Sequence, residues 1–71
     1  MAAVTGSPVG TAYTLDFVLA NLPEGSRDIL EVGCGEGELA ERLAERGFNV
    51  VALDADEACV AAARGRGLEA R

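Results

Sequence analysis

Histidine and lysine are both absent from this chain of 71 residues. The lack of histidine removes the side chain that most often serves as a general base and as a metal ligand. The two cysteines, Cys34 and Cys59, do not have the spacing of a metal site either. The sequence therefore argues against a metal centre and against catalysis by histidine.

Long apolar runs and basic clusters are missing as well. The first ten residues, MAAVTGSPVG, lack the basic and apolar regions of a signal peptide, and no segment approaches the length of a membrane span. The net charge of -6 and the pI near 4.3 argue against binding to nucleic acid or to an anionic membrane. We therefore expect a cytoplasmic protein with reduced thiols and with neither nucleic acid nor membrane as a partner.

What is present suffices for one small globular domain, with 49% hydrophobic and 25% charged residues. Residues 1–12 are interpreted as a flexible leader, because the first ten are small or polar and include glycine and proline. Residues 13–22 are predicted to form a helix that ends before Pro23. Its apolar residues recur at helical spacing: Leu15, Val18, Leu19 and Leu22.

Strand-like and helix-like segments alternate along the rest of the chain. DILEVG (28–33) and NVVALD (49–54) predict short buried strands, and LEAR (68–71) predicts the start of a third. ELAERLAERG predicts a helix closed by Gly47, and EACVAAARGRG a helix capped by Asp56 and closed by Gly65 or Gly67. This order predicts right-handed βαβ units and a parallel sheet whose two faces are covered by helices.

The stretch EVGCGEG places glycines at every second position between the first strand and the next helix. Gly33 would allow a tight turn, while Gly35 and Gly37 would let a ligand approach bare backbone. A helix N-terminus at the carboxyl edge of a sheet favours an anionic group. Asp54 closes the second strand about 20 residues after Gly33, where an acid can accept hydrogen bonds from ribose hydroxyls.

Two other phosphate-binding loops do not fit this stretch. A dinucleotide fingerprint requires a third glycine at position 38, where Glu38 stands, and this acid would repel a pyrophosphate. A P-loop requires Gly-Lys-Ser/Thr, which does not follow. The sequence thus favours a nucleoside-linked ligand of another class.

The segment ILEVGCGEGELAERLAERGFNVVALDADEACV resembles motif I and the following acidic strand end of the class I S-adenosylmethionine-dependent methyltransferases. In that family the loop is written as an acid, any residue and then G-x-G-x-G. The resemblance covers residues 28 to about 64 and implies an α/β class, a truncated Rossmann-like fold with parallel strands and flanking helices. Residues 13–71 would then be the N-terminal part of a single, incomplete S-adenosylmethionine-binding domain.

The resemblance also implies roles for individual residues. Glu31 would lie near the amino or sulfonium side of the cofactor, Asp54 at its ribose and Ala55 beside its adenine. The loop beside its methionine part would comprise Gly33, Cys34, Gly35 and Gly37. The helix over 13–22 would be available as part of a lid. No residue is assigned as catalytic, and the methyl acceptor is left open.

Simpler interpretations accompany each of these roles. Glu31 could be an exposed edge acid, Asp54 a solvated strand end, and Cys34 and Cys59 small packing residues. At the level of function, a non-catalytic S-adenosylmethionine-binding fragment or pseudoenzyme is the alternative, and an NAD-binding oxidoreductase fragment is disfavoured by Glu38.

The length of the chain leads to two further expectations. The first predicted strand would be central in a complete sheet, and one of its edges would here lack a neighbour, which invites completion by a partner chain. We also expect the isolated chain to be marginally stable and inactive in methyl transfer.

Overall fold

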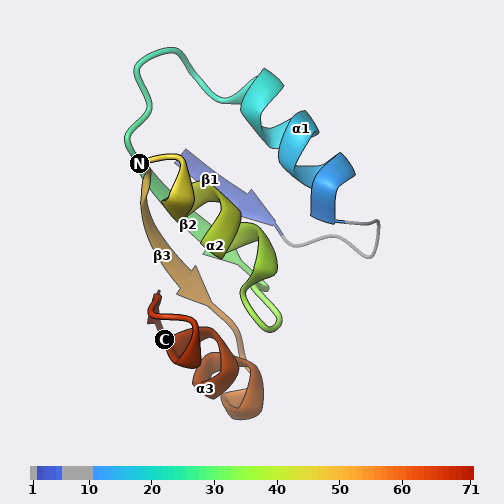
Figure 1. The fold of residues 1–71 in the computed structure, drawn as a ribbon, viewed down its shortest axis with the longest axis vertical. Coiled ribbons are helices and arrows are strands. Elements are labelled where there is room, and N and C mark those ends of the chain that lie inside the picture. Colours follow the sequence, from blue (N-terminus) through green and yellow to red (C-terminus); the bar gives the residue numbers. More distant parts are fainter. Residues whose placement is uncertain (1, 6–10) are drawn as a thin grey trace.

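A parallel sheet with helices packed against it forms the described part of the chain (Figure 1). The computed structural model describes residues 2–5 and 11–71. Within them the strands are β1 (Ala2–Thr5), β2 (Asp28–Val32), β3 (Asn49–Leu53) and β4 (Glu69–Ala70), and the helices are α1 (Thr11–Asn21), α2 (Glu38–Glu45) and α3 (Glu57–Gly65). The strands lie side by side in chain order. The predicted α/β order is thus confirmed, including the short strand near the C-terminus.

Strand β1 occupies a position that the sequence did not predict. It pairs in parallel with β2, from Ala2 opposite Ile29 to Thr5 opposite Val32. The expected flexible leader is therefore wrong for residues 2–5, which form β1, and for Thr11 and Ala12, which begin α1 two residues before the predicted helix start. Residues 1 and 6–10 of that leader lie outside the described residues. The expected unpaired edge of β2 is also wrong, because β1 and β3 flank it on its two sides.

The described helices all pack on one face of the sheet. Ile29 of β2 shares a buried cluster with side chains of α1 and α2, and Ala52 of β3 shares a second one with side chains of α2 and α3. Across the sheet Ile29 pairs with Val50 and Ala52 pairs with Ala70, so both clusters lie on the same side. Each strand lies beside the strand that precedes it in the chain, and the sheet grows in one direction. Right-handed crossovers in such a sheet place every connecting helix on the same side.

The opposite face of the sheet is left without a helix among the described residues. Its strand positions alternate with those of the buried clusters and include Leu30, Val32, Val51 and Leu53. Val32 is 46% exposed. The prediction that helices cover both faces is therefore wrong for this part of the chain.

The helix ends follow the sequence signals closely. The Asp56 side chain accepts a hydrogen bond of 2.8 Å from the Ala58 N–H and caps α3, as predicted. Gly47 and Gly67 follow α2 and α3 with φ of +91° and +83°, so Gly67 rather than Gly65 closes α3. No helix over the described residues combines the length and the hydrophobicity that a membrane span needs.

Candidate functional site

The glycine-containing loop connects β2 to α2 at the carboxyl edge of the sheet. Gly33, Gly35 and Gly37 have φ of +73°, +56° and +92°, a region that side chains disfavour. The N–H groups of Gly33 and Cys34 both donate to the Leu53 carbonyl, at 2.8 and 2.9 Å. The end of β3 therefore holds the start of the loop in place.

The glycines of this loop do not share one role. A Cβ atom built on Gly33 or Gly35 meets no heavy atom within 4 Å, so the space beside their backbone is open. On Gly37 it would lie 2.8 Å from Leu68 Cδ1 and 3.1 Å from Ala63 Cβ. The backbone of Gly33 and Gly35 is thus left uncovered, whereas the clearance at Gly37 is used by the protein's own packing.

Asp54 lies directly after β3, and its carboxylate is bonded to the loop. Oδ2 accepts a hydrogen bond of 2.9 Å from the Gly35 N–H, and Oδ1 accepts one of 2.9 Å from the Asp56 N–H. The bond from Asp56, followed by that from Gly35, lowers the pKa of Asp54. The carboxylate is therefore ionised at neutral pH, and its oxygens keep lone pairs for a further donor. Ala55, the next residue, is exposed.

Glu31 is the most unusual side chain of the site. It is 1% exposed, and neither of its carboxyl oxygens has a hydrogen-bond partner. It points to the helix-covered face, where Ala52 is its neighbour across the sheet. Burial raises the pKa of Glu31 from 4.5 to about 7. The interpretation as an exposed edge acid is wrong, because Glu31 is a buried carboxyl group without a hydrogen-bond partner, which is rare in folded proteins.

The N-terminus of α2 adds a partial positive charge at the same edge. Gly37 is the N-cap and supplies no side-chain hydrogen bond to the helix. The aligned peptide dipoles of a helix place positive charge at this end, where the N–H groups are not used within the helix. The site therefore combines two acidic side chains, Glu31 and Asp54, with the partial positive charge of a helix N-terminus. This combination suits a ligand that carries both a positive and a negative charge.

The cysteine of the loop is a packing residue. Cys34 is 7% exposed and clusters with Ala40, Ala52 and Ala63. Burial, followed by the charges of Glu31 and Asp54, raises the pKa of its thiol, which disfavours the reactive thiolate. Cys34 and Cys59 are both free thiols, and no cluster of metal-binding side chains occurs among the residues described.

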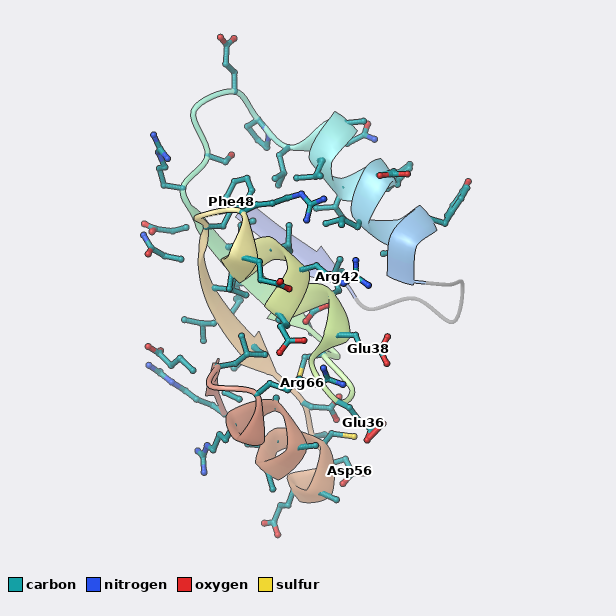
Figure 2. The ribbon with its side chains drawn as sticks, in the orientation of Figure 1. Glu36, Glu38, Arg42, Phe48, Asp56 and Arg66 are labelled. Atoms are coloured by element: carbon teal, nitrogen blue, oxygen red, sulfur yellow. The ribbon has the colours of Figure 1, made fainter. Side chains whose placement is uncertain are left out.

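Arg66 supports the loop from outside, and the sequence analysis missed it. The side chain lies beside the loop near Glu36 (Figure 2), and its Nε donates to the Glu36 carbonyl at 2.9 Å. Its Nη1 lies 2.9 Å from Glu41 Oε1. This side chain at the end of α3 therefore contacts both the loop and α2. An arginine near a helix C-terminus usually indicates only a favourable dipole interaction, so no local signal could have found these contacts.

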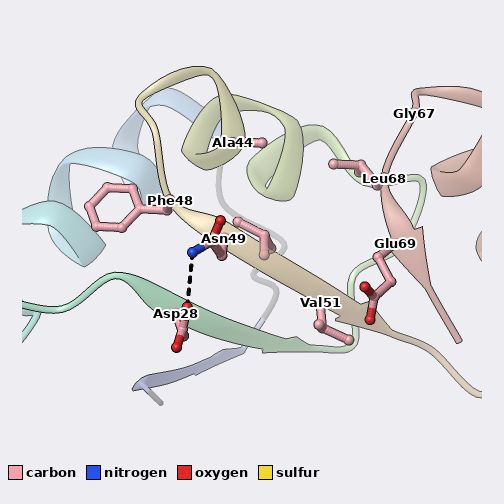
Figure 3. Close-up of a pocket in the computed structure, with 9 residues that line it drawn as sticks. Asp28, Ala44, Phe48, Asn49, Val51, Gly67, Leu68 and Glu69 are labelled. Atoms are coloured by element: carbon pink, nitrogen blue, oxygen red, sulfur yellow. Dashed lines mark hydrogen bonds between the residues drawn. The ribbon is translucent and has the colours of Figure 1, made fainter.

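A separate hollow of about 360 Å³ lies at the amino end of β3, away from the loop (Figure 3). Phe48, Val50 and Leu68 are among its lining residues, and Asn49 Nδ2 donates to Asp28 Oδ1 at 3.0 Å beside it. None of the predicted site residues lines this hollow. Ligands of open α/β sheets bind at the carboxyl edge, so the glycine loop is the better candidate site.

Comparisons with known proteins agree with this geometry. A family model described as a methyltransferase domain matches residues 29–71. The ubiquinone biosynthesis O-methyltransferase of Hahella chejuensis is 44% identical over 55 residues, which are 78% of this chain and 23% of that protein. A putative methyltransferase of Geobacillus sp. is 49% identical over 43 residues, 61% of this chain and 17% of that protein. The chain thus spans less than a quarter of these curated relatives, and no solved structure gives a significant match.

Proposed function

Because the chain belongs to the methyltransferase-domain family of class I S-adenosylmethionine-dependent enzymes, we propose that it is the cofactor-binding part of such a methyltransferase. The observation that carries this proposal is Glu31, a buried carboxyl group without a partner, two residues before a stretch of open glycine backbone. A buried carboxyl group of this kind fits a ligand that brings its own cation into the protein.

The charges of the ligand match the polarity of the site. S-adenosylmethionine carries an ammonium group, a sulfonium group and a carboxylate on a nucleoside. We assign the cationic end to Glu31, the carboxylate to the N-terminus of α2, and the ribose hydroxyls to Asp54. Gly33 and Gly35 leave the space in which the methionine part lies, with Cys34 and Gly37 shaping the loop. Ala55 is small and exposed, and leaves room for the adenine.

The residues of this chain bind and orient the cofactor and act as neither general acid nor general base in methyl transfer. When bound, S-adenosylmethionine supplies a methyl group that is transferred from sulfur by direct displacement. Such a reaction depends on the alignment of donor and acceptor, which a loop hydrogen-bonded to Leu53 and Asp54 supports. Acceptor binding and catalysis are assigned to the part of the relatives that lies outside the matched region, and a cytoplasmic location with free thiols accompanies the proposal.

A non-catalytic S-adenosylmethionine-binding module would use the same residues, and an NAD-dependent oxidoreductase would not. The first residue of α2 is Glu38, an exposed acid at the position where a dinucleotide site has glycine. Its charge opposes a pyrophosphate at this helix end, so the observation disfavours NAD.

Calorimetric titration of the chain with S-adenosylhomocysteine and with NAD tests the proposal. We expect saturable binding of S-adenosylhomocysteine with a stoichiometry near one, and weaker or undetectable binding of NAD. Asp54→Ala should weaken the first interaction, whereas Asp28→Ala, at the opposite end of the same sheet, should not. Tighter binding of NAD than of S-adenosylhomocysteine would overturn the proposal.

A further inference from the structure

We infer that Glu31 holds a proton in the ligand-free protein and releases it when the ammonium group of a ligand binds, so that this residue selects ligands with a cationic end. The inference rests on the proposed function, because it takes S-adenosylmethionine or its product as the ligand. It goes beyond that function, since it assigns both a proton release and a selectivity to one side chain.

The surroundings of Glu31 favour its neutral form when no ligand is present. The side chain is 1% exposed and lies on the same face of β2 as Ile29, which is packed among leucine and valine side chains of α1 and α2. Neither oxygen of Glu31 accepts a hydrogen bond. An ionised carboxylate in such a place would lose its hydration without replacement, at a large cost in free energy. The raised pKa of Glu31, about 7, agrees with this argument.

Burial is the cause that raises the pKa of Glu31, and no positive charge on a neighbouring element acts to lower it. Around it, the Cys34 thiol is buried and neutral, and Asp54 is bonded to Gly35 and Asp56. On α1 and α2 the ionisable groups are exposed or half-buried, and Glu41 is paired with Arg66. These groups are Tyr13, Asp16, Glu38, Glu41, Arg42 and Glu45.

A ligand ammonium group changes this balance, because it provides a positive charge and N–H donors beside the carboxyl oxygens. The carboxyl O–H bond of Glu31 then breaks, its electron pair stays on the oxygen, and the proton passes to the solvent. A ligand with the same nucleoside and sulfur but no amino group cannot pair with the ionised form. 5′-Methylthioadenosine is such a ligand. It lacks the carboxylate of S-adenosylhomocysteine as well as the ammonium group, so the comparison between the two rests on the pH dependence of their affinities.

Binding of S-adenosylhomocysteine below neutral pH should therefore be coupled to proton release. With a pKa of about 7 in the free protein, the association constant should fall about fivefold from pH 7 to 6 and about tenfold from pH 6 to 5. Calorimetry in two buffers of different ionisation enthalpy should give close to one proton released at pH 6 and almost none at pH 8. The affinity for 5′-methylthioadenosine should be weaker and, in the same range, should not fall with decreasing pH.

Two variants and one direct measurement separate the outcomes. Glu31→Gln should abolish the proton release. Asp54→Asn should weaken binding, but the binding that remains should still release a proton. Carbon-13 NMR of the glutamate carboxyl groups should show Glu31 titrating near pH 7 without ligand and at a lower pH with ligand. This measurement uses the natural chain, so it does not depend on the folding of a variant. Absence of S-adenosylhomocysteine binding at every pH would overturn the proposed function. Binding with constant affinity and no proton release, or an ordinary Glu31 titration in the free protein, would overturn this inference alone.

Discussion

The carboxylate of Asp54 accepts a hydrogen bond from the Gly35 backbone at 2.9 Å and so joins the end of β3 to the loop that follows β2. The two residues are 19 positions apart in the chain. The carboxyl ends of neighbouring parallel strands lie at the same edge of the sheet, so an acid after one strand can reach the loop after its neighbour. One oxygen of a proposed ligand-binding acid is therefore already used to order the loop.

Replacing Asp54 by alanine removes both its support of the loop and its proposed contact with ribose. We expect the affinity for S-adenosylhomocysteine to fall about 10- to 100-fold, as is usual for the loss of hydrogen bonds to a charged group. Hydrogen exchange of the Gly35 amide should also become faster, since its acceptor is gone. Asp28→Ala is the matched control, because Asp28 bonds Asn49 at the other end of the sheet. Unchanged affinity in Asp54→Ala would contradict the assignment.

Alanine at Gly37 should cost more stability than alanine at Gly47. Both glycines have φ near +90°, at +92° and +91°, so both substitutions pay the same penalty for a left-handed backbone, about 1–2 kcal/mol. At Gly37 the added methyl group also meets Leu68 and Ala63, whereas at Gly47 nothing lies within 4 Å. We expect an additional loss of about 1–3 kcal/mol for Gly37→Ala in urea unfolding. Equal losses for the two variants would show that the end of the loop, at the N-terminus of α2, can move away from α3.

The ionisation of Glu31 should lower the stability of the ligand-free protein as the pH rises. Its folded-state pKa of about 7 lies above the ordinary value of 4.5, so the folded state binds the proton more tightly and loses this advantage between pH 4.5 and 7. The difference corresponds to about 3 kcal/mol. The stability of Glu31→Gln relative to the natural chain should therefore increase by about this amount from pH 4 to pH 8.

Urea unfolding of both proteins at the two pH values checks this expectation. The comparison cancels the effects of the other carboxyl groups, which the two proteins share. A difference in stability that does not change with pH would mean that Glu31 is solvated or paired in solution.

The two faces of β2 should respond differently to truncation. Ile29 is fully buried beneath α1 and α2, whereas Val32 is 46% exposed on the face without a helix. We expect Ile29→Ala to cost about 2–5 kcal/mol and Val32→Ala less than about 1 kcal/mol. Thermal unfolding followed by circular dichroism measures both. A large loss in Val32→Ala would indicate that another copy of the chain covers this face in solution.

Features that depend on a few adjacent residues could be predicted from the sequence. The cap at Asp56, the turn at Gly47 and the glycine loop each follow from a local conformational requirement, and all three are found as expected. The pairing of Asp54 with the loop was not foreseen, although both partners were singled out. The residue types of Gly35 and Asp54 and their places in the chain indicated the site. The hydrogen bond between them depends on how far β3 extends beside β2, which the sequence does not reveal.

Features that depend on distant contacts were missed for a common physical reason. Residues 2–5 carry no strong strand pattern and become a strand by pairing with β2, whose sequence lies more than 20 residues away. The loop contacts of Arg66 cross 30 positions to Glu36. The placement of the helices on one face follows from the order of the strands, which composition and periodicity do not encode. In each case, the tertiary arrangement and not local propensity decides the outcome.

The face of the sheet that carries Val32 and Leu53 also affects the thermodynamics of unfolding. Apolar surface that is already hydrated in the folded protein does not become newly hydrated when the chain unfolds, so it adds nothing to the heat-capacity change. Scanning calorimetry should therefore give this chain an increment below the usual value of about 12–15 cal/mol/K per residue. Its stability should then vary with temperature along a flatter curve than that of a domain whose sheet is covered on both sides.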